Sequence, residues 1–383
     1  MVYRNEAELL RKNGIEVVAY EKKNDDIASR FSASISTVWA EQTYRELVTL
    51  IKKEKPDIAH FHNIWYLISP SAYYACKDAG VPVVQTLHNF RMFCANGLLL
   101  REGKVCEDCI GRIPWRGVTR GCYRNSWQYS LPVALSEMYH KQKKTWTEQV
   151  DAYIALTEFG KNKFIECGLP EKKIFIKPNF ISGSPDSTTS SQNYAVFIGR
   201  LSKEKGIDVL IDALKNFKTS ELQSSESFSF KIIGDGPLRE QAEAKSIGQG
   251  AKGVKIEFTG RRSHKECMEL LKNARFLVMP ALCYENFPLT IVEAFACGKP
   301  VVASRLGVMA DIVEDNKTGM LFEPGNAEDL ANAIKRLWED EALCREIGQN
   351  ARAEFEKKYT AEKNIKSLID IYHETIKRQR TCE

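Results

Sequence analysis

The most informative stretch of the sequence is Cys283-Tyr284-Glu285-Asn286-Phe287-Pro288-Leu289-Thr290-Ile291-Val292-Glu293-Ala294-Phe295-Ala296-Cys297-Gly298-Lys299-Pro300. Apolar residues 276–279 precede it and residues 300–303 follow it, and both short runs are typical of buried strands. Between them, residues 290–296 have the composition of a helix, and Gly298 marks its end. Strand, loop, helix and strand in this order form the repeating unit of an α/β domain with a parallel sheet.

The same alternation extends over the whole chain. In the second half it predicts strands over residues 194–198, 228–233, 255–258, 276–279 and 300–303 and helices over residues 206–216, 237–245, 264–272, 290–296 and 327–338. In the first half it predicts strands over residues 15–20, 58–61, 81–87, 152–156 and 174–176 and helices over residues 1–13, 39–53 and 71–79. A unit of about 25–30 residues that repeats in this way predicts a doubly wound fold.

A polar segment separates the two halves. Residues 182–191 are small, polar and without periodicity, so we interpret residues 181–193 as a linker. The expected domains are residues 1–180 and 194–357. Residues 358–383 are expected to form a C-terminal helix that packs back on the first domain.

Length and composition limit the classes of protein to consider. The chain has 383 residues, of which 43% are hydrophobic and 27% charged, which is enough to bury two cores. A formal net charge of +5 suits an anionic substrate or an anionic membrane surface and is too small to predict nucleic-acid binding. No apolar run reaches the ~18 residues of a membrane span. Eleven cysteines without an N-terminal apolar segment favour a cytosolic location with reduced thiols.

Charged residues gather where the predicted strands of the second half end, which is where open α/β sheets bind ligands. Arg200 and Lys205 flank a turn that opens a helix, and two cations at such a place suit a diphosphate. The alternative is a solvated surface loop. In the turn Gly234-Asp235-Gly236, the glycines are expected to serve backbone geometry.

Two glutamates bracket the next helix start. Glu285 precedes the helix, and Glu293 lies within it on an otherwise apolar face. A carboxylate on such a face needs a polar partner, and the hydroxyls of a ribose would satisfy it. The alternative is a structural glutamate paired with an arginine or a backbone amide.

At this point the sequence resembles the donor domain of the family 4 glycosyltransferases, which have the GT-B fold of two Rossmann-like domains facing a cleft. The resemblance rests on five motifs in the same order: GRLSKEKG (199–206), GDGPL (234–238), FTGR (258–261), YENFPLTIVEAFACGKPVVAS (284–304) and NKTGMLFEPGNAEDLANAI (316–334). It implies transfer of a sugar from a nucleoside-diphosphate sugar with retention of the anomeric configuration.

The resemblance also implies roles for individual residues. Arg200 and Lys205 would bind the diphosphate, Glu293 the ribose, and Glu285 the transferred sugar. The backbone at Arg262 would face the base. Backbone amides at the helix start would contact sugar and phosphate oxygens, and these belong to Phe287, Leu289 and Thr290. Pro288 stands where many members have glycine, and it has no N–H to contribute.

No Asp-x-Asp motif occurs in the chain, which fits an enzyme without a catalytic metal in which Arg200 and Lys205 neutralise the leaving diphosphate. The leaving phosphate can itself take the proton of the acceptor, so no protein base is required. In the first half, the resemblance implies that His88, at the end of a predicted strand, hydrogen-bonds to the donor sugar. His60 and His62 end the preceding strand, with capping or core packing as the alternative.

Four cysteines follow His88 in the pattern C-x11-C-x2-C-x12-C, namely Cys94, Cys106, Cys109 and Cys122. A C-x2-C pair within a four-cysteine set is typical of a structural zinc site. Unrelated buried thiols and a redox disulfide are the alternatives. The basic and aromatic residues 112–127 in this loop are interpreted as facing an anionic or lipid-linked acceptor, or as loop packing.

We therefore expect a glycosyltransferase that uses a nucleotide sugar and a cell-surface polysaccharide or lipid-linked glycan as acceptor, with peripheral contact at the cytoplasmic membrane face. A nucleotide-sugar epimerase of the same fold and an inactive donor-binding homologue are the alternatives. Residues 1–13 read as the family's first helix, with Asn13-Gly14 as its C-cap. The sequence thus predicts that a strand and a glycine-rich loop are missing before Met1 and that an extended reading frame is more active.

Overall fold

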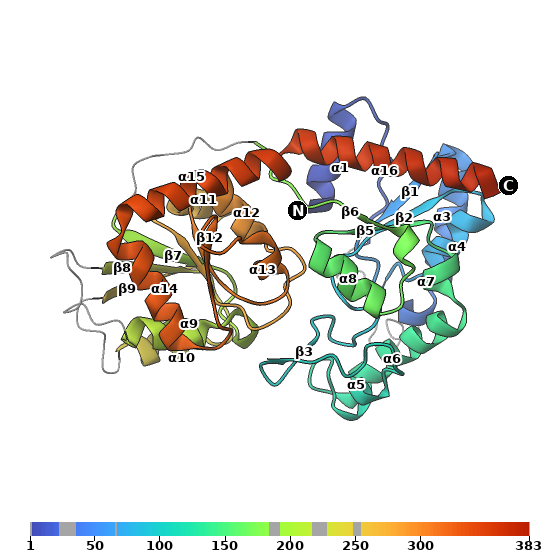
Figure 1. The fold of residues 1–383 in the computed structure, drawn as a ribbon. Coiled ribbons are helices and arrows are strands. Elements are labelled where there is room, and N and C mark those ends of the chain that lie inside the picture. Colours follow the sequence, from blue (N-terminus) through green and yellow to red (C-terminus); the bar gives the residue numbers. More distant parts are fainter. Residues whose placement is uncertain are drawn as a thin grey trace. The chain divides into compact units, whose positions relative to one another are not determined.

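The computed structural model describes residues 2–22, 36–65, 67–183, 192–216, 228–247 and 254–382. The chain divides into two compact units (Figure 1). Unit 1 comprises Met1–Arg101, Cys106–Pro178 and Asn364–Glu383, and unit 2 comprises Glu102–Val105 and Asn179–Lys363. Each unit is an α/β fold around one parallel sheet.

Unit 2 contains a six-stranded parallel sheet. Its strands are β7 (Tyr194–Ile198), β8 (Phe228–Ile233), β9 (Val254–Gly260), β10 (Leu277–Met279), β11 (Val301–Ser304) and β12 (Gly319–Phe322). Their spatial order is β12-β11-β10-β7-β8-β9. Chain order therefore reverses between the neighbours β7 and β10, which is the switch point at which doubly wound sheets bind ligands.

Helices cover this sheet on both sides (Figure 1). They are α9 (Ile207–Asn216), α10 (Arg239–Ile247), α11 (His264–Asn273), α12 (Leu289–Ala296), α13 (Val308–Ile312), α14 (Ala327–Glu339) and α15 (Glu341–Lys358). The apolar faces of α9 and α14 join the sheet in the main core, and α12 packs against α15 and α11. The near-continuous apolar strands follow from burial on both faces.

Unit 1 contains a four-stranded parallel sheet in the order β1-β2-β5-β6. Its strands are β1 (Ala59–Phe61), β2 (Val83–Thr86), β5 (Ala152–Ala155) and β6 (Ile174–Ile176). The main helices that come before β6 in the chain are α1 (Val2–Lys12), α3 (Glu41–Glu54), α4 (Ser71–Asp78), α6 (Trp127–Gln142), α7 (Thr145–Glu148) and α8 (Glu158–Glu166). Between β2 and α6 lie the short strands β3 (Leu100–Arg101) and β4 (Lys104–Val105) and the short helix α5 (Trp115–Thr119).

The C-terminal helix α16 (Ala361–Cys382) contributes to the core of unit 1. Ile365, Leu368 and Ile371 pack with Leu10 of α1 and with buried residues of β2 and β5, so α1 and α16 share one apolar cluster. From Asn364 onward this helix belongs to unit 1. Among the described residues, none of the helices is both long and apolar enough to cross a membrane.

The α/β prediction is confirmed, and most predicted strands and helices lie within one or two residues of their expected bounds. The predicted strand over residues 15–20 is wrong. These residues follow the C-cap turn of α1 without strand pairing, and the guanidinium of Arg11 donates to Val17 O instead. A short apolar run forms a strand only beside a hydrogen-bonded neighbour, and β1 pairs with β2 alone in the described part of unit 1. Most of the predicted linker, residues 184–191, lies outside the described residues.

Candidate active site

Two loops of unit 2 meet at the switch point between β7 and β10. Gly206 ends the β7 loop with φ +70°, and a Cβ atom there would overlap the carbonyl oxygen of Pro280. Leu282 N donates to Glu204 O over 2.8 Å. Only glycine combines this positive φ with so close an approach, so the two loops are held together by their backbones.

The junction of these loops brings Lys205 and Glu285 together. Lys205 Nζ lies 2.6 Å from Glu285 Oε1, and their side chains are 28% and 15% exposed. Burial lowers the pKa of Lys205, but the charge of Glu285 and the hydrogen bond to it outweigh burial, so the pKa is raised overall. Lys205 is therefore a fixed cation at the switch point, with a carboxylate as its partner.

The neighbouring turn after β8 supports this arrangement. Cβ atoms on Gly234 and Gly236 would overlap the backbone oxygens of Gly199 and Leu201. Leu201 N donates to Asp235 O over 3.0 Å, which ties the two turns together. The glycines thus serve backbone packing. Arg200 lies exposed on the β7 loop.

Glu293 of α12 lies close to α11. Its Oε1 is 2.8 Å from His264 Nε2, and the Glu293 side chain is 13% exposed while the histidine is 50% exposed. Ser263 and Glu266 form a capping box that fixes the start of α11 and hence the position of His264. The polar partner that an apolar helix face requires for Glu293 is therefore a histidine that remains accessible to solvent.

The remaining predicted donor residues lie along the same edge of the sheet. Pro288 is the N-cap of α12, and Leu289 and Thr290 open the helix. The ring of Phe287 lies 6.0 Å from that of Tyr359. Arg262, after β9, is half-exposed, with Nη1 3.5 Å from Glu266 Oε1. Free backbone N–H groups at the start of α12 and the cations after β7 can hold an anion between them.

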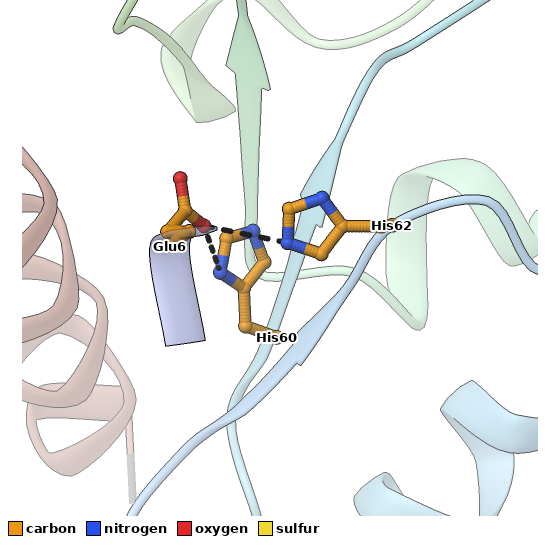
Figure 2. A group of neighbouring side chains, drawn as sticks. All are labelled: Glu6, His60 and His62. Atoms are coloured by element: carbon orange, nitrogen blue, oxygen red, sulfur yellow. Dashed lines mark ion pairs between the residues drawn. The ribbon is translucent and has the colours of Figure 1, made fainter. Parts of the chain in front are cut away.

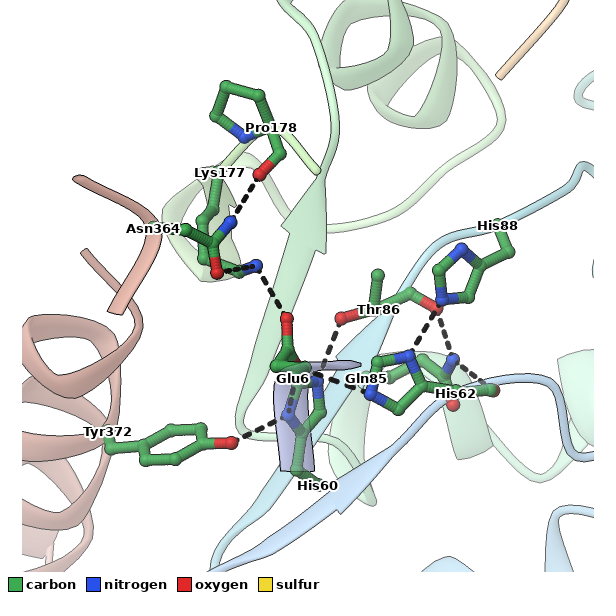
Figure 3. Close-up of polar contacts among 10 residues, drawn as sticks. All are labelled: Glu6, His60, His62, Gln85, Thr86, His88, Lys177, Pro178, Asn364 and Tyr372. Carbon is green, nitrogen blue, oxygen red and sulfur yellow. Dashed lines mark hydrogen bonds and ion pairs between the residues drawn. The ribbon is translucent and has the colours of Figure 1, made fainter. Parts of the chain in front are cut away.

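In unit 1, three histidines gather at the carboxyl ends of β1 and β2 (Figure 3). His88 Nε2 lies 2.8 Å from His62 Nδ1, and the two rings stack. His60 uses both ring nitrogens, with Tyr372 Oη at 2.7 Å and Thr86 Oγ1 at 2.8 Å. Burial lowers the pKa of His88 to about 3 and that of His60 well below its ordinary value, so both are neutral. His62 and His88 also line an open pocket, together with Asn63, Trp65, Asn89, Met92 and Trp146.

Glu6 of α1 contacts two histidines of this cluster. Its Oε1 lies 3.4 Å from His60 Nδ1 and 3.3 Å from His62 Nε2, a spacing that would also suit metal ligands (Figure 2). Its Oε2 accepts a hydrogen bond from Lys177 Nζ over 2.7 Å. Because this buried ammonium already balances the carboxylate, a second cation would be repelled, so a charge-balanced polar cluster describes the group better than a metal site.

Cys94, Cys106, Cys109 and Cys122 line one pocket, with Arg116 and Arg120 beside them. All four are free thiols, and burial raises the pKa of Cys109 to about 11. The sulfur atoms do not reach ligand spacing: among the described residues, Glu6, His60 and His62 alone form a group with all ligand atoms within 4.8 Å. Glu137 is buried near Cys94 and Cys109, with neither carboxylate oxygen hydrogen-bonded. The thiols thus share one pocket, with an unpartnered carboxylate nearby.

Both halves of the chain match models of known protein families. Residues 2–182 match the model described as Glycosyltransferase Family 4, and residues 185–354 match Glycosyl transferases group 1. The chain belongs to the family 4 glycosyltransferases. An uncharacterized glycosyltransferase of Methanocaldococcus jannaschii, MJ1178, is 33% identical over 228 residues, which are 60% of this chain and 61% of that protein. O-antigen chain mannosyltransferase C of Escherichia coli is 25% identical over 186 residues, 48% of this chain and 47% of that protein.

The matched region therefore spans about half to three fifths of the length of these relatives. Solved structures share the GT-B fold with this family member. A sucrose-phosphate synthase from Thermosynechococcus elongatus has a TM-score of 0.66 at 16% identity and covers 97% of this chain and 92% of its own. Anabaena HepE in complex with UDP and glucose has a TM-score of 0.61 at 19% identity, with 95% and 87% covered.

Sequence reasoning did not find Glu6, Lys177, His264 or Tyr372. The sequence does indicate that Glu6 needs a partner. It lies one turn before Leu10 on the buried face of α1, where a carboxylate must be paired. Its partner Lys177 lies 171 residues away along the chain. Local patterns do not report such pairs.

Proposed function

We propose that this family 4 glycosyltransferase moves a sugar from a nucleoside-diphosphate sugar to a glycan or lipid-linked acceptor, with retention of the anomeric configuration. The observation that carries the proposal is the pair Lys205–Glu285 at the switch point of unit 2. It presents a cation and a carboxylate where a doubly wound sheet binds a nucleotide. The ammonium of Lys205 suits a diphosphate, and the carboxylate of Glu285 suits sugar hydroxyls.

In this reaction the bond between the anomeric carbon and the diphosphate oxygen breaks while the acceptor oxygen attacks the same face of the sugar. The proton of the acceptor hydroxyl moves to an oxygen of the leaving diphosphate. Lys205 and Arg200 stabilise the negative charge that develops on the diphosphate, and Glu285 orients the sugar through its hydroxyls. Two cations supply the charge neutralisation, which leaves the reaction without need of a catalytic metal.

The nucleoside is expected to bind at Glu293, whose carboxylate accepts hydrogen bonds from the ribose diol. His264 Nε2 lies 2.8 Å from this carboxylate, and the histidine is half-exposed, so it can move aside. The backbone at Arg262 faces the base, and the first amides of α12 contact phosphate and sugar oxygens. UDP is the first probe, because the HepE structures contain it.

Calorimetric titration with UDP, GDP and ADP tests the proposal. Glu293→Ala should weaken binding of the preferred nucleotide by tenfold or more, because a charge-assisted hydrogen bond is worth about 1.5–3 kcal/mol. His264→Ala is the matched control, since it removes the competing partner of Glu293 and should leave affinity equal or higher. If no nucleoside diphosphate binds, or if Glu293→Ala binds as tightly as the native chain, the proposed donor site is wrong.

An anionic membrane surface is proposed as the place where the acceptor is met. Of the ten large apolar side chains that are exposed in the described residues, seven lie within residues 98–139 of unit 1: Leu98, Ile113, Trp115, Trp127, Leu135, Met138 and Tyr139. Exposed arginines accompany them at positions 112 and 124. Aromatic side chains with nearby cations are typical of surfaces that lie on anionic lipid. We call residues 98–139 the aromatic segment.

A structural zinc held by Cys94, Cys106, Cys109 and Cys122 is the remaining part of the proposal. Four thiols that line one pocket fit the donor chemistry of zinc. Zinc would then stabilise a loop that contains little regular secondary structure between β2 and α6.

A further inference from the structure

Three side chains of unit 1 form a line of polar contacts that ends at His88. Glu6 Oε1 lies 3.3 Å from His62 Nε2, and His62 Nδ1 lies 2.8 Å from His88 Nε2 (Figure 3). The three residues come from different parts of the unit: α1, the end of β1 and the end of β2. Each imidazole has one donor and one acceptor nitrogen when it is neutral, so the contacts determine which nitrogen carries the proton.

The line begins at a charged group. Glu6 is 2% exposed, and Lys177 Nζ donates to its second oxygen over 2.7 Å. Burial raises the pKa of Glu6, but the charge of Lys177 and the hydrogen bond from His62 outweigh burial and lower it, so the carboxylate is ionised. Lys177 in turn donates to Asn364 Oδ1 over 3.2 Å, which fixes the ammonium. An ionised carboxylate can only accept hydrogen bonds.

The protonation of the two histidines follows from this acceptor. Beside an ionised carboxylate oxygen, His62 carries its proton on Nε2, so its Nδ1 is the acceptor. His88 Nε2 must then donate to it, and the lone pair of His88 is left on Nδ1. We propose that Glu6 acts through His62 to hold His88 in the Nε2-protonated tautomer, so that His88 Nδ1 is available as a hydrogen-bond acceptor.

The groups around this line do not compete for the proton. The second histidine of β1, His60, is already engaged by Tyr372 and Thr86. Burial raises the pKa of Tyr372 well above its ordinary value, so that residue keeps its proton. The ring of Tyr3 meets His62 edge-on at 5.4 Å and has no hydrogen bond with it among those described. Among the described residues, the charged side chains that act on the line are therefore Glu6 and Lys177, and the charge of the N-terminal amino group also lowers the pKa of His88.

The consequence is a constraint on what His88 can recognise. With its lone pair on Nδ1, His88 accepts a hydrogen bond from a hydroxyl group and rejects a ligand atom that is itself only an acceptor. This part of the inference rests on the proposed function, because a sugar substrate supplies hydroxyl groups of this kind. Glu6 and His62 are positioning residues, since they act on the ligand through His88.

The tautomer can be measured without any substrate. In the full chain with 15N-labelled histidine, long-range 1H–15N correlation at neutral pH should show His88 with a protonated Nε2 and an unprotonated Nδ1. His62→Phe keeps the ring that stacks on His88 and removes the acceptor, so His88 should become a mixture of tautomers. His62→Gln offers an amide oxygen in place of Nδ1 and should restore the Nε2 proton.

A protonated Nδ1 in the native chain, or the same tautomer in His62→Phe as in the native chain, would overturn the proposal. His60→Phe is the control for mere loss of packing, and it should leave the tautomer of His88 unchanged. Should that variant shift the tautomer as far as His62→Phe does, the line through His62 is not the cause.

Turnover then tests the functional part. His62→Phe should lower kcat about tenfold, the value of about one hydrogen bond, with UDP affinity unchanged, and His62→Gln should recover most of the loss. Equal kcat in the native chain and His62→Phe would overturn the role in recognition even if the tautomer shifts. Failure of the proposed function gives a different result, namely the predicted tautomers together with no nucleotide binding.

Discussion

Lys205 Nζ lies 2.6 Å from Glu285 Oε1, although 80 residues separate them in the chain. The first residue follows β7 and the second follows β10, and these strands are neighbours at the switch point of unit 2. In the proposed function Lys205 binds the diphosphate of the donor. The ammonium would then be shared between the diphosphate and the carboxylate of Glu285.

If Lys205 is shared in this way, substitution of Lys205 and substitution of Glu285 should have opposite effects on UDP affinity. Lys205→Met should weaken UDP binding by about tenfold or more, because a charge-assisted contact is lost. Glu285→Gln should bind UDP as tightly as the native chain or more tightly, because the amide no longer competes for Lys205, and its turnover should fall. Calorimetry and initial rates measure the two effects. Lys317→Met, on an exposed ion pair of the same unit, is the control and should change neither. Weaker UDP binding by Glu285→Gln would contradict the competition.

The cysteine pocket predicts a metal content. Protein purified in reducing buffer should contain about one zinc per chain, and Cys106→Ser should lose it, whereas Cys267→Ser, which changes a free thiol outside the pocket, should keep it. Because ligation requires thiolates, binding of added zinc should release protons and weaken at acid pH. Elemental analysis and proton release in weakly buffered solution check both points. A folded native chain that contains and binds no zinc would refute the site.

The aromatic segment predicts binding to lipid. The native chain should float with vesicles that contain anionic lipid and bind less to neutral vesicles, because arginines and apolar side chains act together. Trp115→Ala with Trp127→Ala should reduce binding several-fold, since both rings are more than half exposed and available to the interface. Ile247→Ala removes an 81% exposed side chain of unit 2 and should have no effect. Equal losses in the two variants would show that general surface hydrophobicity, and not this segment, is responsible.

His140 predicts a pH dependence of stability. It is fully buried, with Nδ1 3.0 Å from Thr145 Oγ1 and Nε2 2.8 Å from Val38 O, and burial lowers its pKa to about 4. The unfolded chain has an ordinary histidine pKa near 6.5, so between these values the unfolded state binds the extra proton and stability falls as pH falls. The free energy of unfolding should drop by about 1.4 kcal/mol per pH unit from this residue, to a total of about 3 kcal/mol.

Urea unfolding between pH 4 and 7 measures this dependence. His140→Gln should be less stable at neutral pH and should show a shallower loss on acidification than the native chain. His373→Gln, at an exposed position of α16, should follow the native curve. Parallel curves for His140→Gln and the native chain would show that His140 does not titrate on unfolding.

The order of strands and helices in unit 2 follows from the sequence alone, and so does the sheet edge at which the candidate donor residues lie. Hydrophobic periodicity, helix starts and glycine turns are local signals, and the motifs around Arg200, Glu285 and Glu293 lie where predicted strands end. Residues 15–20 show the limit of such signals. They form a short apolar run of the kind that is typical of a strand. A strand also needs a hydrogen-bonded neighbour, and no local pattern says whether one is present.

Which side chains meet depends on the folded arrangement of the chain. Lys205 meets Glu285, Glu293 meets His264, and Glu6 meets Lys177 because strand order and helix packing bring distant segments together. Each pair joins buried or half-buried groups whose desolvation must be offset by a partner. A sequence can reveal that such a group needs a partner, as Glu293 and Glu6 do. Which partner it has depends on the spatial order of the strands, and that order is a property of the folded chain.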